Sequence, residues 1–219
     1  MRIFLRFGKN IRLIPFNYQS FLTGAIHKWL GIANGEHGSI SLYSFSWFQN
    51  IIANTDGINF TNDSYFFISA HNDEIIKKII NGVMADSSLC FGSYITDIQI
   101  AETPIFSSSH TFYCASPIFI KRKIENEEKH ITFMDSRSSE YLTETLKTRL
   151  NKAGLSTEAV QVEFDASYNN SRTKLIHYKG IANKANICPI NISGSPEQIA
   201  FAWNVGVGNS TGIGFGALK

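Results

Sequence analysis

The first hundred residues switch between strand-like and helix-like patterns of apolar and polar positions. Apolar residues that alternate with polar ones, or aromatic and β-branched residues in clusters, indicate strands, whereas apolar residues three and four positions apart indicate helices. We expect strands over residues 2–7, 40–48, 64–70 and 93–102, and helices over residues 18–31 and 73–85. The resulting order, β-α-β-β-α-β, is that of the ferredoxin-like fold, which RNA-recognition domains also use.

The second half repeats this order less regularly, after a linker marked by Pro104 and the serines at 107–109. We expect strands over residues 112–121, 130–134, 160–165, 172–179 and 186–193, a helix over 138–153, a short helix after Ser195 and a last strand that closes the chain. The run Ser195-Pro196-Glu197-Gln198 is typical of a capped helix start. The sequence therefore predicts an α+β protein with two ferredoxin-like domains in tandem, over residues 1–103 and 111–219.

The composition suits two packed domains, because 43% of the 219 residues are hydrophobic and 17% are charged. No run of about 18 apolar residues indicates a transmembrane helix, and basic residues interrupt the apolar positions of residues 1–13, unlike in a signal peptide. The three cysteines, Cys90, Cys114 and Cys188, form no CxxC pair and cannot all pair with one another. We therefore expect a reduced, cytoplasmic setting and no membrane association.

Basic residues gather at both ends of the chain, although the formal net charge is only +2. Residues 1–35 hold five basic and no acidic side chains, and residues 166–219 hold five basic and one acidic. Residues 36–165, between them, hold ten basic and seventeen acidic side chains. If the fold brings both ends together, they form a positive surface suited to a polyanion. Ordinary solvated charge explains the same distribution equally well, so charge alone does not decide between the two.

The segment GVGNSTGIGFG near the C-terminus contains five glycines, Gly206, Gly208, Gly212, Gly214 and Gly216. Glycine admits positive φ and lets backbone N–H groups approach a phosphate closely. The spacing fits neither a P-loop, which needs lysine followed by serine or threonine, nor a dinucleotide loop, whose third glycine is replaced here by Thr211. An RNA-binding loop is the functional interpretation, and a tight turn with an edge strand is the structural one.

This segment resembles the C-terminal glycine-rich motif of the CRISPR-associated endoribonucleases of Cas family six, which cut precursor guide RNA within its repeats. Other segments are similar to that family in order and position. Residues 13–19 resemble the segment that leads into the family's first helix, and residues 36–48 resemble its histidine region and second strand. Ser116-Pro117-Ile118, followed by Lys121-Arg122-Lys123, resembles the strand that opens the family's second domain. The resemblance covers nearly the whole chain and implies two ferredoxin-like domains, as the pattern also predicts.

The resemblance implies an endoribonuclease that uses no metal and no other cofactor, with CRISPR repeat RNA as its partner and a CRISPR effector complex as a further possible one. The 2′-hydroxyl of the RNA would attack the adjacent phosphorus, leaving a 2′,3′-cyclic phosphate and a 5′-hydroxyl. A general base and a general acid supply roughly 10²–10⁴-fold of the rate, and the near-neutral pKa of histidine suits both roles. The sequence is consistent with cleavage that uses no metal, since it has no HExxH motif and no cysteine cluster.

Two of the six histidines are candidates for the catalytic residue. His37 precedes the second expected strand, where the family's N-terminal catalytic histidine often falls. His27 lies in the first expected helix, points away from its apolar face, and shares its side with the small residue Gly24. Many family members carry a tyrosine where His27 stands, so the assignment between the two histidines stays open.

The RNA-binding residues that we expect lie in four places. They are Tyr18 and Lys28 near the first helix, Lys121, Arg122 and Lys123 at a strand end, Arg172, Lys174 and Lys179 on a later strand, and the five glycines. Phosphate contacts would supply most of the affinity and make it depend on salt. A core position is the alternative for Tyr18, and a solvated strand end beside acidic residues is the alternative for 121–123.

Two other functions are compatible with the sequence. One is a non-catalytic RNA-binding subunit of a CRISPR effector complex, which would share the fold and the glycine-rich segment but would not need His27 and His37. The other is an unrelated ferredoxin-like module for a small ligand or a protein, which would show no salt-dependent affinity for RNA.

Overall fold

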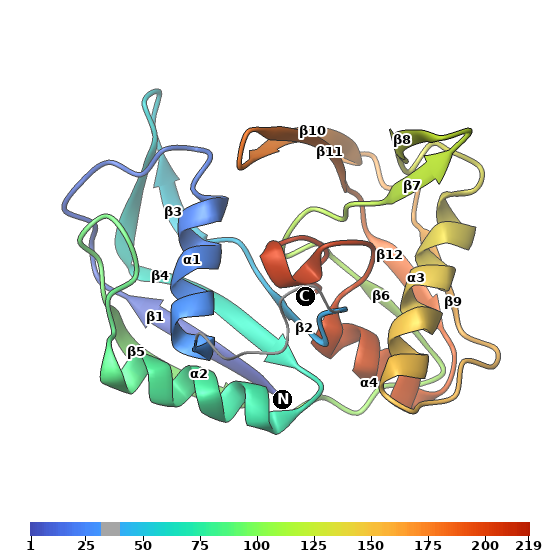
Figure 1. Cartoon of the computed structure of the whole chain (residues 1–219), viewed down its shortest axis with the longest axis horizontal. Coiled ribbons are helices and arrows are strands. Elements are labelled where there is room, and N and C mark those ends of the chain that lie inside the picture. The colour runs from blue at the N-terminus through green and yellow to red at the C-terminus, as the bar shows by residue number, and fades with distance from the viewer. Residues whose placement is uncertain (32–39) are drawn as a thin grey trace.

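The computed structural model describes residues 1–31 and 40–219, whose elements form two α+β halves lying side by side (Figure 1). The N-terminal half consists of β1 (Arg2–Phe7), α1 (Gln19–Leu30), β2 (Tyr43–Phe45), β3 (Gln49–Ala53), β4 (Ile58–Ala70), α2 (Asp73–Ala85) and β5 (Ile95–Ala101). Its antiparallel sheet has the order β2-β4-β1-β5, and β3 also pairs with β4. This is the ferredoxin-like arrangement that the order of elements predicts.

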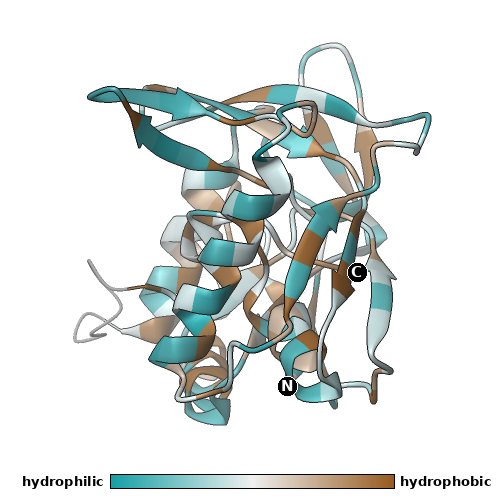
Figure 2. Ribbon diagram, turned by 90° about the vertical axis from the view of Figure 1, so that its right-hand side faces the viewer, coloured by the Kyte–Doolittle hydropathy of each residue, from teal (hydrophilic) through white to brown (hydrophobic). Residues whose placement is uncertain are grey.

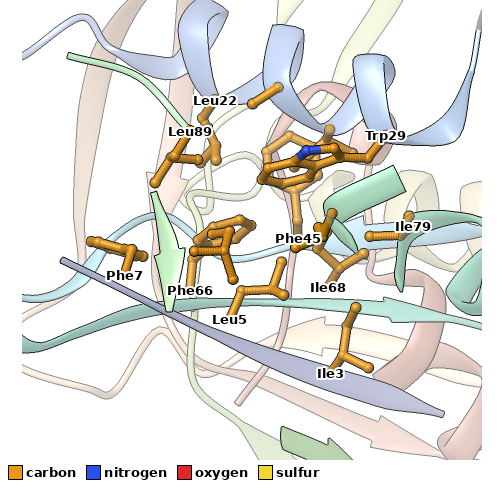
Figure 3. Close-up of a cluster of buried hydrophobic side chains, with 14 of the residues drawn as sticks. Ile3, Leu5, Phe7, Leu22, Trp29, Phe45, Phe66, Ile68, Ile79 and Leu89 are labelled. Atoms are coloured by element: carbon orange, nitrogen blue, oxygen red, sulfur yellow. The ribbon is translucent and has the colours of Figure 1, made fainter. Parts of the chain in front are cut away.

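The N-terminal core lies between this sheet and its two helices. Ile3, Leu5 and Phe7 alternate along β1 and are buried, as the period of two requires for a strand with one covered face. Figure 3 shows Leu5 and Phe66 of the sheet beneath Trp29 of α1, and the Trp29 and Phe66 rings are nearly parallel with centroids 6.4 Å apart. Full burial of one such side chain contributes roughly 1.5–3 kcal/mol to stability.

The hydropathy pattern does not predict β3. All five of its side chains are at least partly exposed, so no alternation marks the strand, and the polar residues 54–57 that follow it look like a loop. Its partner β4 begins at Ile58 rather than at residue 64, and the additional residues of β4 pair with β3. Backbone pairing, and not side-chain pattern, therefore creates this strand.

The C-terminal half contains a second sheet, two helices and two hairpins. Its elements are β6 (Ser109–Phe112), β7 (Lys121–Ile124), β8 (Glu127–His130), α3 (Ser138–Lys152), β9 (Gln161–Phe164), β10 (Arg172–Tyr178), β11 (Ile181–Ile187), β12 (Ile190–Ser193), α4 (Pro196–Val205) and the 3₁₀ turn η1 (Thr211–Ile213). The sheet order is β6-β12-β9, whereas β7 with β8 and β10 with β11 form separate two-stranded sheets. Figure 2 looks onto this half and shows hydrophobic residues interleaved with hydrophilic ones along its helices.

Prolines divide two segments that the pattern predicts as single strands. The expected strand 112–121 becomes β6 and β7, on either side of Pro117, and the expected strand 186–193 becomes β11 and β12, on either side of Pro189. Proline has no N–H group for a ladder hydrogen bond, which explains both interruptions. The strand expected over 130–134 lies earlier, as β8, where it pairs with β7.

The strand expected at the end of the chain is reduced to a short pairing with the residues after β6. Lys219 N donates to Tyr113 O over 2.9 Å, and Ala115 N donates to Ala217 O over 2.8 Å. The pairing is antiparallel and takes the place of a fourth strand beside β6, which completes a second ferredoxin-like arrangement. The expected α+β class is confirmed, while the two domain boundaries stay a prediction.

The helix ends follow the signals in the sequence. Ser195 accepts a hydrogen bond from Gln198 N, and the Gln198 side chain accepts one from Ser195 N, so the expected capping box opens α4. Gly154, with a φ of 73°, follows the last residues of α3. Among the described residues, no helix is long and apolar enough to cross a membrane.

Arg2 of β1 joins the two halves at their junction. Its side chain is buried, and its guanidinium donates to Trp203 O and Leu218 O over 3.1 and 2.8 Å, and to Ser69 Oγ over 2.6 Å. The guanidinium carbon also lies 3.8 Å from the ring centroid of Phe67 and 3.5 Å from that of Trp203. Burial lowers the pKa of Arg2 to about 9. Because a buried cation is costly unless it is hydrogen-bonded, these contacts favour a single placement of one half against the other.

Candidate functional site

The glycine-rich segment, residues 206–216, passes through the centre of the molecule between the two halves (Figure 1). It begins where α4 ends, and all five of its glycines are buried. The turn η1 within it contacts both α1 and β2 of the N-terminal half. The two ends of the chain therefore meet here, as the hypothesis of a joint binding surface requires.

Two of the glycines stand where the ends of this segment cross. Gly216 has a φ of 68°, and a Cβ atom there would overlap the carbonyl oxygen of Val207. Gly206 has a φ of 74°, and its Cβ atom would lie 2.5 Å from the carbonyl oxygen of Gly216. Val207 N donates to Gly216 O over 2.9 Å and joins the two ends. Only glycine satisfies both the positive φ and the close approach.

The expected cradle of glycine N–H groups needs a correction. The N–H groups of Gly206, Gly214 and Gly216 donate to backbone carbonyls of the fold over 2.8, 3.2 and 2.9 Å. Each backbone amide has one N–H group, so these three are already used. Close packing explains why glycine occupies these three positions. RNA would have to contact the segment through groups other than these three N–H groups.

Side chains of the N-terminal half hold the glycine-rich segment by its carbonyl groups. The donors are Gln19 Nε2 to Ile213 O over 2.6 Å, Tyr43 OH to Gly212 O over 3.1 Å, and Trp47 Nε1 to Gly214 O over 2.8 Å. They come from α1, from β2 and from the residues just after β2. The position of the segment thus depends on how the two halves pack.

His27 of α1 lies beside one of these contacts. Its Nε2 is 3.3 Å from the hydroxyl oxygen of Tyr43, and that hydroxyl donates to Gly212 O. The imidazole is half-buried, and Gly24, one turn earlier, has open space where a side chain would be. An imidazole in such a place can exchange a proton with a bound ligand. His37, the other candidate, lies outside the described residues.

Tyr18 lies in the core position that the sequence leaves open for it, and Lys28 forms an exposed ion pair, so RNA contact by Lys28 stays a prediction. Tyr18 is buried and stacks on Phe48 with ring centroids 4.4 Å apart, and its hydroxyl accepts a hydrogen bond from Phe48 N over 3.2 Å. Burial raises the pKa of this hydroxyl. Lys28 Nζ donates to the Asp86 carboxylate over 2.8 Å and to Ser88 O over 2.7 Å. Their polar atoms are therefore engaged within the N-terminal half.

The basic run 121–123 lies on β7, and its three side chains have different surroundings. Lys121 Nζ pairs with Glu128 over 2.8 Å, as a solvated hairpin predicts, and Lys123 is exposed opposite the same glutamate. Arg122 instead turns onto α3, where Nη2 donates to Tyr141 O over 2.7 Å and to Thr145 Oγ1 over 3.0 Å. An exposed pair such as Lys121 with Glu128 contributes about 0–1 kcal/mol, so a phosphate can displace it.

The basic strand β10 borders a groove between the two halves. Lys174 Nζ lies 5.0 Å from the Trp47 ring centroid, and both residues line, with the exposed Phe16, two adjoining cavities of about 170 and 330 Å³. Arg172 and Lys179 are exposed at and just beyond the two ends of β10. Aromatic faces next to cations suit the bases and phosphates of single-stranded RNA.

Three residues of this region are missed by sequence reasoning. Tyr43 and Trp47 belong to an aromatic run that predicts a strand and nothing more. Arg149 lies on the apolar face of α3 between Leu146 and Leu150, and its guanidinium donates to carbonyls of the glycine-rich segment. A charged residue on an apolar helix face is a signal that could have identified it.

Comparison with known proteins finds one family match. The sequence model of the family described as "CRISPR associated protein Cas6, C-terminal" matches residues 100–219. A protein of Methanocaldococcus jannaschii named CRISPR-associated endoribonuclease Cas6 1 is 25% identical over an alignment of 223 residues, gaps included, that covers 95% of this chain and 88% of that protein.

Solved structures share the fold over the whole chain. A structure described as "CRISPR associated protein Cas6" has a TM-score of 0.83 at 22% identity and covers 100% of this chain and 98% of its own. A structure described as a Cas6-related gene product from Pyrococcus furiosus has a TM-score of 0.84 at 23% identity, with 100% and 97% covered. At these identities the likeness shows the fold alone, and it confirms the tandem ferredoxin-like arrangement.

Proposed function

Because this chain belongs to the CRISPR-associated Cas6 family, we propose that it is an endoribonuclease that processes CRISPR repeat RNA. The family match confirms the resemblance identified from the glycine-rich segment. The relative from Methanocaldococcus jannaschii is named for the same activity. One observation in this chain carries the proposal: His27 meets the glycine-rich segment through Tyr43 at the junction of the two halves.

The proposed cleavage uses the 2′-hydroxyl of the RNA and no metal ion. A general base removes the proton of the 2′-hydroxyl, and the oxygen attacks the adjacent phosphorus. The bond from phosphorus to the 5′-oxygen breaks as a general acid protonates that oxygen, which gives a 2′,3′-cyclic phosphate and a 5′-hydroxyl. His27 and His37 are the candidates for these two roles. The rest of the rate enhancement comes from holding the attacking and leaving atoms in line and from stabilising the charged phosphorane.

A repeat RNA with one 2′-deoxy nucleotide tests this mechanism directly. We expect wild-type protein to cut the all-ribose RNA at one position in excess EDTA, and to leave the RNA with a single deoxy substitution before that position uncut. The deoxy RNA should bind with nearly the same Kd, because one hydroxyl contributes little to an affinity dominated by phosphates. Gel separation of end-labelled products measures both the cut and the cyclic phosphate.

The control is a deoxy substitution several nucleotides away, which should leave cleavage intact. Cleavage of the RNA that lacks the attacking hydroxyl would contradict the mechanism. Tight binding of the all-ribose RNA without any cut would instead favour the non-catalytic RNA-binding subunit.

Lys174→Ala tests whether the groove beside Trp47 binds RNA. We expect weaker binding, and a slope of log Kd against log salt that is smaller by about one, because one phosphate contact is lost. Lys77→Ala is the matched control, since Lys77 is an exposed lysine of α2 that pairs with Glu74. Equal salt slopes for the two variants would show that Lys174 makes no phosphate contact with the RNA.

A further inference from the structure

A cavity of about 450 Å³ lies between α3 and the glycine-rich segment. Its lining includes Thr211, the residue next to Gly212, whose carbonyl accepts the hydrogen bond from Tyr43. Ser41 also lines the cavity, two residues before Tyr43. The cavity, here called the α3 pocket, is therefore next to the contact between Tyr43 and His27.

Arg149 lines the α3 pocket as a buried cation without a counter-ion. Its side chain is 3% exposed, and no carboxylate of the described residues forms an ion pair with it. Nη1 donates to Gly206 O over 3.1 Å and Nη2 donates to Gly208 O, while Nε has no partner there. Burial lowers the pKa of Arg149 to about 10, so the group stays charged at neutral pH. A buried charge is costly unless it is paired.

The hydroxyl of Thr211 is a second unsatisfied group in the lining of the α3 pocket. Thr211 is 1% exposed, and its Oγ1 has no hydrogen-bond partner among the described residues. An unmade hydrogen bond at a buried polar atom costs stability and therefore points to a missing partner. Thr211 and Arg149 therefore both line the α3 pocket and both carry a hydrogen-bonding atom without a partner among the described residues.

The other polar residues of the lining favour an anion as well. Ser41 and Thr148 add hydroxyls, and Arg122 adds a second guanidinium. Glu144 is the acidic residue of the lining, 3.4 Å from the Arg122 guanidinium and 56% exposed at its side chain. Two cations against one carboxylate leave the pocket positive, and Glu144 competes with any anion for Arg122.

We propose that the α3 pocket binds a phosphodiester group of the substrate RNA, with Arg149 and Thr211 as its donors and Arg122 as a second cation. The inference rests on the proposed function, which supplies RNA as the source of the phosphate. Guanidinium groups match phosphate oxygens in geometry and charge. Because Thr211 adjoins Gly212, a phosphate held there fixes the RNA backbone beside His27 and positions it for cleavage.

Thr211→Val separates this role from a structural one. Valine keeps the shape of the side chain and removes only the hydroxyl, so a hydroxyl with no partner in the fold predicts an unchanged or higher Tm. We expect the Kd for labelled repeat RNA to rise about tenfold, since a hydrogen bond to a charged group is lost. A lower Tm would show that the hydroxyl serves the fold, and would overturn the proposal.

Glu144→Gln should change affinity in the opposite direction. Removing the carboxylate takes away the anion that competes for Arg122, and we expect the Kd to fall about two- to fivefold at low salt, which is the range of an exposed ion pair. Glu140→Gln is the matched control, because Glu140 is an exposed residue of the same helix outside the lining. An equal effect of both variants would mean that the change in overall charge, and not the α3 pocket, causes it.

The same assay distinguishes failure of this site from failure of the proposed function. Wild-type protein that neither binds nor cuts the repeat RNA would overturn both. Wild-type protein that cuts normally, together with Thr211→Val and Glu144→Gln variants that keep the wild-type Kd, would overturn the α3 pocket alone.

Discussion

His27→Ala is expected to lower the single-turnover rate of repeat RNA cleavage by roughly 10²–10⁴-fold, which is the contribution of one general acid or base. The Kd for RNA should change little, because the imidazole is half-buried and phosphate contacts elsewhere supply most of the affinity. Quenched time courses with protein in excess measure the rate, and filter binding measures the Kd.

Tyr43→Phe tests whether the contact between Tyr43 and His27 supports cleavage. It removes the hydroxyl that lies 3.3 Å from His27 Nε2 and donates to Gly212 O. Loss of one such hydrogen bond costs about 1 kcal/mol, so we expect a rate loss of up to about tenfold. The control is His110→Ala, an exposed histidine of β6 whose ring packs on Phe112.

Wild-type cleavage by His27→Ala would exclude His27 as general acid or base. The assignment would then pass to His37, whose alanine variant belongs in the same experiment. Wild-type cleavage by both variants would contradict catalysis by either candidate histidine.

Gly216→Ala is expected to destabilise the protein by roughly 3 kcal/mol, as the sum of backbone strain and a steric overlap. The φ of 68° strains any other residue, and the added Cβ atom would overlap Val207 O. For a chain of this size the Tm should fall by about 6–12 °C. RNA affinity should fall as well, because the hydrogen bond from Val207 N to Gly216 O joins the ends of the glycine-rich segment.

Gly180→Ala is the matched control for this prediction. Gly180 also has a positive φ, 81°, but it follows β10 in the hairpin turn and has open space where a Cβ atom would be. Alanine at position 180 would therefore introduce backbone strain without a steric overlap, which costs about 1–2 kcal/mol of stability. Equal Tm values for the two variants would show that the close approach at Gly216 has no energetic weight.

Most of the fold could be predicted because its signals are local. The apolar alternation of residues 2–7 predicts β1 with the bounds that the structure shows, and the periodicity of 73–85 does the same for α2. The serine and glutamine at the start of α4 form the expected capping box. By contrast β3 has no alternation and depends on its partner, and the two prolines at 117 and 189 interrupt strands whose hydropathy looks continuous.

Less of the site could be predicted, because its residues meet across long stretches of chain. Sequence reasoning selects His27 and the glycine-rich segment, but not the hydroxyl of Tyr43 that lies between them. It selects Tyr18 and Lys28 as RNA contacts without indicating that the polar atoms of both have partners in the fold, since an aromatic or basic side chain looks the same in a sequence whether its polar atom is free or engaged.

The family, the α+β class and most of the order of elements follow from the sequence, because periodicity, capping residues and the glycine-rich segment are all encoded within short stretches. The tertiary structure was needed to show why the glycines are there and what surrounds them. Tyr43 and Gly212 are 169 positions apart, and Arg149 reaches Gly206 from another helix. Hydrogen bonds over such separations depend on how the two halves pack, and no local pattern records that packing.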